Sequence, residues 1–210
     1  MNGDFFNLEW CDYDSVLNVR DSDVLAAITE EDLRSFTFDG LKRRLGMHSE
    51  TLSRVLARLE VEGYVKKTKE GYEVAPNNHR VLNLNVAQSE KSCVTLVRTF
   101  LPSDVSTDRL TLDLRGRWFG LLRWLGMGQT DDGIAMKWVT ENGDVQVDAK
   151  IAESTLTIEA KFLHRHDSDL ALRAAYQLIT HIGKLCTRTP KPVARPVAYF
   201  AGYPSFMTTA

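Results

Sequence analysis

The chain has 210 residues, 26 Lys and Arg against 28 Asp and Glu, and a formal net charge of −2. This length suits one large or two small domains, and the absence of a long apolar run excludes a helical membrane-spanning protein. The three cysteines are widely spaced and form no CxxC pair, so we expect a protein of the reducing cytoplasm without a disulfide framework.

The N-terminal region is acidic, because residues 1–36 hold nine acidic and two basic residues. It opens with an aromatic arm, which is not a signal peptide and which contains Phe5, Phe6 and Trp10. We expect this arm to pack on its own domain; the alternative is a partner subunit. A first helix follows, with Asp21 or Ser22 as its cap and with an inward face formed by Val24, Leu25 and Ile28.

Two helices are predicted in the next segment. The first covers residues 38–45, and a tight turn at Gly46–His48 separates it from the second, which Ser49 caps and which ends near Glu62. Residues three and four apart share one face of a helix, and the second helix carries a single apolar stripe of this spacing: Leu52, Val55, Leu56 and Leu59.

A β-hairpin is predicted after these helices. Gly63 suits the left-handed position that follows a helix end. Tyr64–Val65 and Tyr72–Val74 then flank a lysine-rich turn at residues 66–71. Helix, glycine turn, helix and basic hairpin in this order are typical of a winged helix-turn-helix.

The free face of the second helix would enter a DNA major groove, because the apolar stripe packs against the preceding helices. The hydroxyl and arginine side chains of this face suit base and phosphate contacts. Arg44, with Lys42 and Arg43, could contact the DNA backbone from the preceding helix. The hairpin could reach a phosphate or a minor groove. The candidate DNA-binding residues are Lys42, Arg43, Ser49, Glu50, Thr51, Ser53, Arg54, Arg58, Lys66, Lys67 and Lys69. The alternative is that these are solvated charges on an ordinary small helical domain.

The stretch LKRRLGMHSETLSRVLARLEVEGYV, residues 41–65, resembles the winged-helix regulators of the MarR-, ArsR- and IclR-like class. The resemblance implies DNA binding, commonly as a dimer, in a transcription regulator, and it identifies no subfamily. Residues 37–75 hold eight basic and six acidic residues, a moderate patch that a second subunit would double. The alternative is a winged helix that binds protein or RNA.

A different domain is predicted after Pro76, with residues 77–92 as a connector. Residues 145–151 and 156–162 alternate apolar and polar side chains with a period of two, so each predicts a strand with one buried and one solvent-exposed face. A third strand holds Ile134, Met136 and Trp138, and Asn142–Gly143 predicts the hairpin turn after it. Residues 93–100 predict a further strand.

Two helices are expected to cover the apolar face of this sheet, at residues 113–125 and 168–186. The order strand, helix, three antiparallel strands, helix predicts a two-layer α/β sandwich. The predicted fold class is therefore α+β: an N-terminal winged helix-turn-helix followed by a C-terminal two-layer sandwich with an antiparallel sheet.

The helix predicted over residues 113–125 contains a near-repeat, RWFG followed by RWLG. The favoured interpretation is a helix buried on more than one side. The alternative is an effector pocket or dimer interface, in which an arginine meets an anionic ligand and which is lined by Arg115, Trp118, Phe119, Trp124 and Met127.

Enzyme chemistry is not indicated, because the sequence holds no glycine-rich phosphate loop, no GxSxG and no HExxH motif. We expect no enzymatic activity and no cofactor. His164 and His166 could suggest a metal site, but Asp167 or Ser168 suits a helix N-cap at this position, and we expect no metal. Residues 189–210 form a Pro/aromatic tail that is expected to pack on the body or on a second subunit; a disordered end is the alternative.

We therefore expect a cytoplasmic, homodimeric transcription regulator that binds double-stranded DNA and does not bind membranes. Residues 1–76 are the predicted DNA-binding domain with its aromatic arm, and residues 93–188 are the predicted dimerisation domain, which is also a candidate sensor of a small-molecule effector. The alternative is a winged-helix module for protein contacts or RNA binding, without operator binding.

Overall fold

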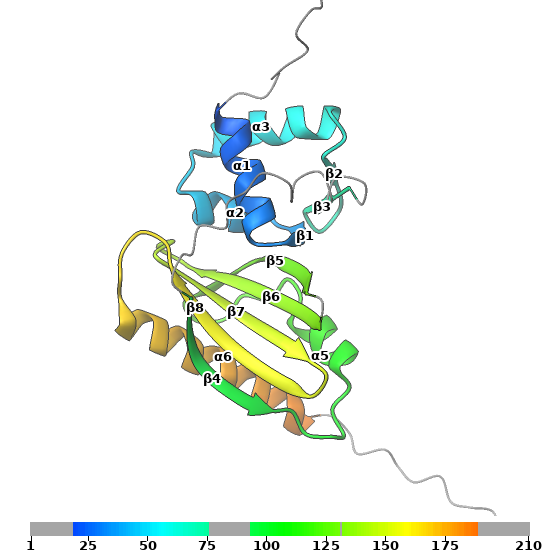
Figure 1. The fold of residues 1–210 in the computed structure, drawn as a ribbon, viewed down its shortest axis with the longest axis vertical. Coiled ribbons are helices and arrows are strands. Elements are labelled where there is room, and N and C mark those ends of the chain that lie inside the picture. The colour runs from blue at the N-terminus through cyan, green and yellow to red at the C-terminus, as the bar shows by residue number, and fades with distance from the viewer. Residues whose placement is uncertain (1–18, 76–92, 131, 189–210) are drawn as a thin grey trace, which may run out of the picture.

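A computed structural model describes residues 19–75, 93–130 and 132–188 (Figure 1). The N-terminal part holds α1 (Val19–Glu30), β1 (Leu33–Phe36), α2 (Phe38–Leu45), α3 (Ser49–Val61), β2 (Val65–Lys67) and β3 (Tyr72–Val74). The C-terminal part holds β4 (Cys93–Phe100), α5 (Thr107–Leu114), β5 (Leu122–Thr130), β6 (Gly133–Thr140), β7 (Val145–Ala152), β8 (Thr155–Phe162) and α6 (Ser168–Arg188). The predicted aromatic arm, connector and Pro/aromatic tail lie outside the described residues.

The described strands form one antiparallel sheet of eight strands, in the order β2-β3-β1-β5-β6-β7-β8-β4. Strand β1 joins the two parts of the chain, because it pairs with β3 on one side and with β5 on the other. The predicted strands β6, β7 and β8 form a meander, and the turn at Asn142–Gly143 has the expected left-handed glycine with φ 81°. The chain is thus a mixed α/β protein, and these strand predictions are confirmed.

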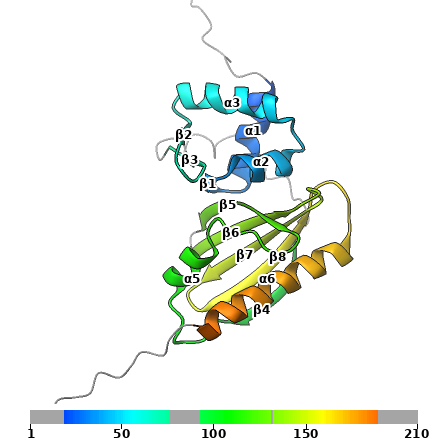
Figure 2. The same ribbon diagram turned by 180° about the vertical axis from the view of Figure 1, so that it is seen from behind.

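Helices α5 and α6 cover one face of the C-terminal strands (Figure 2). The alternating apolar residues of the strands point toward these helices and form the larger core. On α6, the buried stripe is Leu170, Ala171, Ala174, Ala175, Leu178 and Ile182. The predicted second helix and its packing on the sheet are therefore confirmed.

The helix predicted over residues 113–125 is wrong. Helix α5 ends at Leu114, and Gly116 and Gly120 then adopt the left-handed backbone, with φ 71° and 55°. Such residues interrupt a helix, and from Leu122 the chain pairs with β6 as a strand. The C-terminal order is consequently strand, helix, four antiparallel strands, helix, with one strand more than the sequence indicated.

The N-terminal helices enclose a second core. Helix α2 has the predicted bounds, with Thr37 as its N-cap and Gly46 in the left-handed position. The predicted stripe of α3 is buried, and Gly63 adopts φ 78° after the helix end. The N-cap of α3 is His48 rather than Ser49, because the His48 Nδ1 accepts the Glu50 amide at 3.4 Å.

The two parts of the chain share packing as well as strands. Leu125 and Val139, from β5 and β6, belong to the N-terminal core. Glycine permits close approach where β1 meets β5: a Cβ on Gly126 would lie 2.3 Å from the Ser35 carbonyl oxygen, and one on Gly128 would lie 2.2 Å from that of Asp32. The N-terminal part therefore rests directly on the backbone of β5.

Substitution Gly126→Ala is expected to lower the free energy of unfolding by about 1–3 kcal/mol, because the added methyl group collides with β1 backbone. Urea denaturation measures this loss. Gly183→Ala is the control: this α6 glycine has open space around its Cα, so alanine should stabilise the helix by about 0.5–1 kcal/mol. If Gly126→Ala were as stable as the wild type, β1 and β5 could move apart at this position without a loss of stability.

Candidate nucleic-acid interface

Helix α3 lies at the end of the molecule remote from the C-terminal sheet (Figure 1). Its stripe faces the N-terminal core, so the opposite face meets solvent. The candidate residues on this exposed face are Ser49, Glu50, Ser53 and Arg54, while Thr51 and Arg58 are half-buried. The structure therefore brings most of the predicted base-contacting residues onto one accessible surface.

Arg54 has a single ion-pair partner within the described residues, Glu50, at 2.5 Å and one helical turn away. Both side chains are well exposed, with 72% and 66% of their surfaces accessible. Exposed pairs of this kind contribute roughly 0–1 kcal/mol. Arg54 can therefore exchange Glu50 for a phosphate or a base edge at little cost.

Arg58 has a structural role that the sequence did not indicate. Its Nε donates to the carboxylate of Asp21 at 3.1 Å, and its Nη2 donates to the other oxygen of the same carboxylate. Asp21 lies within α1 and its side chain is 0% exposed, so the prediction that Asp21 or Ser22 caps this helix is wrong. The Arg58–Asp21 pair fixes α1 against α3.

The three basic residues of α2 point in different directions. Lys42 lies 3.4 Å from the Ser49 hydroxyl and 3.9 Å from the Asp39 carboxylate. Arg43 donates to the Asp39 carbonyl at 3.1 Å. Arg44 is buried and turned toward the C-terminal sheet, so the expectation that it holds a DNA backbone is wrong.

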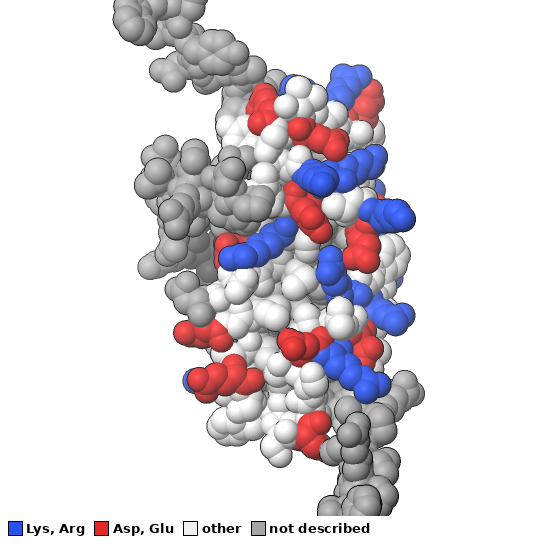
Figure 3. Space-filling view, turned by 90° about the vertical axis from the view of Figure 1, so that its right-hand side faces the viewer, with Lys and Arg blue, Asp and Glu red and all other residues white. Residues whose placement is uncertain are grey.

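The β2–β3 hairpin presents Lys66, Lys67 and Lys69 to solvent. The Lys67 amide donates to the Glu60 carboxylate at 3.1 Å and ties the hairpin to α3. Among residues 19–75, 93–130 and 132–188, no carboxylate pairs with these lysine side chains. Figure 3 views the side of the molecule on which β2 and β3 lie, and it shows Lys and Arg interspersed with Asp and Glu. This surface therefore carries both positive and negative side chains, and the hairpin lysines are local positive charges on it.

A buried ionic cluster connects α2 and the α1–β1 turn with the sheet. Glu31 is 2% exposed, and its carboxylate meets Arg44 at 3.0 Å, Lys137 at 3.1 Å and Lys161 at 2.8 Å. Lys137 also meets Asp148 at 2.8 Å, and Gln146 donates to both carboxylates. We refer to Glu31, Arg44, Lys137, Gln146, Asp148 and Lys161 as the junction cluster.

Electrostatics inside the junction cluster favour the charged forms of Glu31 and Lys137. Burial alone would raise the pKa of Glu31, but Lys137, Lys161 and Arg44 hold it well below its usual range. Burial alone would lower the pKa of Lys137, but Asp148 and Glu31 hold it above its usual range. The alternation of β7 and β8 had indicated a solvent-exposed polar face, whereas the N-terminal part covers Gln146 and Asp148 completely.

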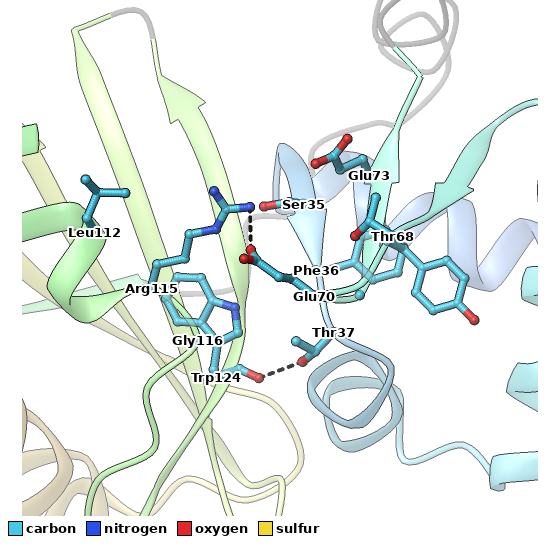
Figure 4. Close-up of a pocket in the computed structure, with 12 residues that line it drawn as sticks. Ser35, Phe36, Thr37, Thr68, Glu70, Glu73, Leu112, Arg115, Gly116 and Trp124 are labelled. Atoms are coloured by element: carbon cyan, nitrogen blue, oxygen red, sulfur yellow. Dashed lines mark hydrogen bonds and ion pairs between the residues drawn. The ribbon is translucent and has the colours of Figure 1, made fainter.

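The structure does not gather the five predicted effector residues around one of the described cavities. A cavity of about 440 Å³ lies between the hairpin, β1 and the segment after α5, and Arg115 and Trp124 line it (Figure 4). Arg115 points across it to Glu70 at 3.0 Å. Trp118 borders an adjoining cavity of about 480 Å³, which shares Glu70, Gly71 and Tyr72 with the first. Phe119 stacks on His181 at 4.7 Å, and Met127 packs against the larger core.

His166, just before α6, is explained by local packing. The ring of His166 stacks on Phe162 with centroids 4.0 Å apart. Asp167 accepts the Leu170 amide at 2.9 Å, which confirms its predicted N-cap role. Within the described ranges, no group of three or more His, Cys, Asp or Glu side chains is arranged to hold a metal ion.

Comparison with protein-family models, with curated proteins and with solved structures finds no match to this chain. In the part of the chain that the structure describes, no helix combines the length and the apolar character needed to cross a membrane.

Proposed function

We propose that this chain is a winged-helix transcription regulator that binds double-stranded DNA in a sequence-specific manner. The observation that carries the proposal is the free face of α3, which presents hydroxyl and arginine side chains beside a lysine-bearing hairpin. The order α1-β1-α2-α3-β2-β3 supports it, because a helix-turn-helix followed by a β-hairpin places the last helix where a major groove can receive it.

Contacts in this proposal divide into two classes. Ser49, Thr51, Ser53 and Arg54, in the first half of α3, would meet base edges, while lysines of α2 and of the hairpin would meet phosphates. Arg58 is left out of the base-reading set because Asp21 engages its guanidinium. Glu50 would act indirectly, by holding Arg54 until DNA replaces it.

A homodimer and an effector complete the proposal. Among the described residues of α2, α3 and the hairpin, few cations have no carboxylate partner, and a symmetric dimer would double the phosphate contacts and read two half-sites. The cavity beside Arg115 is the candidate site for a small-molecule effector, because an anion that displaced Glu70 would release the hairpin from the segment after α5.

A protein-binding role is the competing function, and one observation favours it. The end of α3 exposes Val61, with 89% of its surface accessible, between Glu60 and Glu62. Carboxylates at this position disfavour a nearby phosphate. A winged helix that binds protein would use this acidic and apolar end, whereas DNA binding uses the opposite end with Ser49 and Arg54.

Substitution Arg54→Ala is expected to weaken binding to a preferred DNA sequence by about 1–3 kcal/mol, because one bidentate base contact is lost. The substitution should change the melting temperature little, because Glu50 is the only described ion-pair partner of Arg54. Fluorescence anisotropy with sequences selected from genomic fragments measures the affinity. Arg173→Ala is a matched control, because Arg173 is an exposed arginine of α6 with a similar pairing to Asp169 at 3.2 Å.

Unchanged affinity in Arg54→Ala would contradict the assignment of α3 as the reading helix. Arg58→Ala does not serve as a probe of binding, because it leaves the buried Asp21 carboxylate without this partner and is expected to lower thermal stability as well. Absence of DNA binding by the wild-type protein would favour the protein-binding alternative.

A further inference from the structure

Trp118 is an exposed aromatic residue that the described packing does not require. It lies in the segment between α5 and β5, and 55% of its surface is accessible. By contrast, the neighbouring Trp124 and Trp138 are buried and contact each other edge to face. Exposed indoles are frequent at binding sites, since they supply a large flat contact area with few rotatable bonds.

Two arginines hold this indole in place. The guanidinium of Arg123 lies 5.3 Å from the ring centroid, and that of Arg43 lies 5.7 Å from it. Arg123 is itself anchored, because it donates to the Gly120 carbonyl at 2.8 Å and pairs with Glu141 at 3.0 Å. Cation–π contacts of this kind restrain the ring orientation. A base that stacks on Trp118 would therefore take the place of the Arg43 guanidinium, because Arg123 is anchored whereas Arg43 pairs with no carboxylate within the described residues.

The same indole borders the cavity of about 480 Å³, which reaches α3 and the hairpin turn. Ser53 lies on its α3 side, and Lys67 and Lys69 lie on its hairpin side. The cavity therefore continues the proposed DNA surface onto the C-terminal part of the chain.

The charge around this cavity favours an anion. Its acidic neighbours already have cationic partners, because Asp39 pairs with Lys42 at 3.9 Å and Glu70 pairs with Arg115 at 3.0 Å. Within the described residues, no carboxylate pairs with Arg43, Lys67 or Lys69. An aromatic surface next to such cations matches the chemistry of a nucleotide, which joins a flat base to a phosphate.

We propose that this cavity binds one unpaired nucleotide of a DNA substrate, with its base stacked on Trp118 and its phosphate held by Lys67 and Lys69. The inference rests on the proposed DNA-binding function and adds to it a preference for DNA that carries an unpaired base. Bases inside a duplex are stacked on one another and offer no free face to the indole, so the site is reached only by a base at an overhang, a gap or a distorted step.

Fluorescence anisotropy with two probes tests this inference: a short DNA duplex that carries the preferred sequence selected from genomic fragments, and the same duplex with a single-stranded oligothymidine overhang of about four nucleotides at either end. The wild-type protein is expected to bind the overhang probe about tenfold more tightly, as one base–aromatic stack would predict. Trp118→Ala should lose this gain and leave the affinity for the plain duplex within about twofold. Trp118→Phe should keep most of the gain, because a ring remains.

Tyr176→Ala is the control variant, since Tyr176 is an exposed aromatic residue on α6 that does not line the cavity. Equal wild-type affinity for the two probes would overturn the inference while leaving the proposed function intact. If Trp118→Ala still bound the overhang probe more tightly than the plain duplex, the inference would be overturned as well. Failure of the wild-type protein to bind either probe would overturn the proposed function together with the inference.

Discussion

Replacing Glu31 with alanine is expected to lower the free energy of unfolding by about 3–5 kcal/mol. The substitution removes the carboxylate that Arg44, Lys137 and Lys161 share. Removing one partner from a buried ionic group is costly, because the remaining charges keep the desolvation penalty without the attraction that offset it. Chemical denaturation at neutral pH, followed by tryptophan fluorescence, measures the loss.

Glu141→Ala is the control for this experiment. Glu141 also pairs with an arginine, Arg123 at 3.0 Å, but its side chain is 66% exposed, so its removal should cost less than about 1 kcal/mol. A loss in Glu31→Ala no larger than that of the control would show that solvent reaches the junction cluster and screens its charges.

The pH dependence of this contribution has a defined sign. Because the folded protein holds the pKa of Glu31 below its ordinary value of 4.5, Glu31 contributes its full stabilisation above that pH. The stabilisation is lost as the pH falls below 4.5 toward the folded-state pKa. The junction cluster therefore stabilises the contact between the N-terminal part and the sheet throughout the neutral range.

Replacing Lys66, Lys67 and Lys69 together with alanine is expected to reduce affinity for all DNA sequences alike. The slope of log affinity against log salt should fall by about 0.9 for each lost phosphate contact. If all three lysines contact phosphate, the affinity near physiological salt should fall by about two orders of magnitude. The side chains are exposed, so thermal stability should change little.

A charge-matched control separates local contacts from net charge. The triple substitution of Arg109, Arg173 and Lys184 removes the same number of positive charges from α5 and α6, away from the hairpin. It should leave the salt slope unchanged. A fall in affinity only for the preferred sequence, with an unaltered slope, would instead show that the hairpin reads bases.

Elements with a strong local pattern were predictable from the sequence. The apolar stripe of α3, the glycines after α2 and α3 and the alternation in β7 and β8 each concern neighbours within a few residues. Turns such as Asn142–Gly143 belong to the same class. The candidate residues Ser49, Ser53 and Arg54 were predicted to share a face because helical spacing alone determines it.

Tertiary contacts determined the elements and buried charges that have no strong local pattern. Strand β1 has four residues and little alternation, and it is a strand because β3 and β5 pair with its two edges. Only the first four residues of β5 fell within the helix predicted over residues 113–125, yet the glycines of β5 admit β1 and the strand pairs with β6. Lys137 and Glu31 are 106 positions apart, so no local pattern could bring them together. Backbone pairing and charge neutralisation between residues so far apart in the sequence depend on the complete fold. These tertiary contacts alone determined which charged residues are buried in the junction cluster and which remain available to a partner.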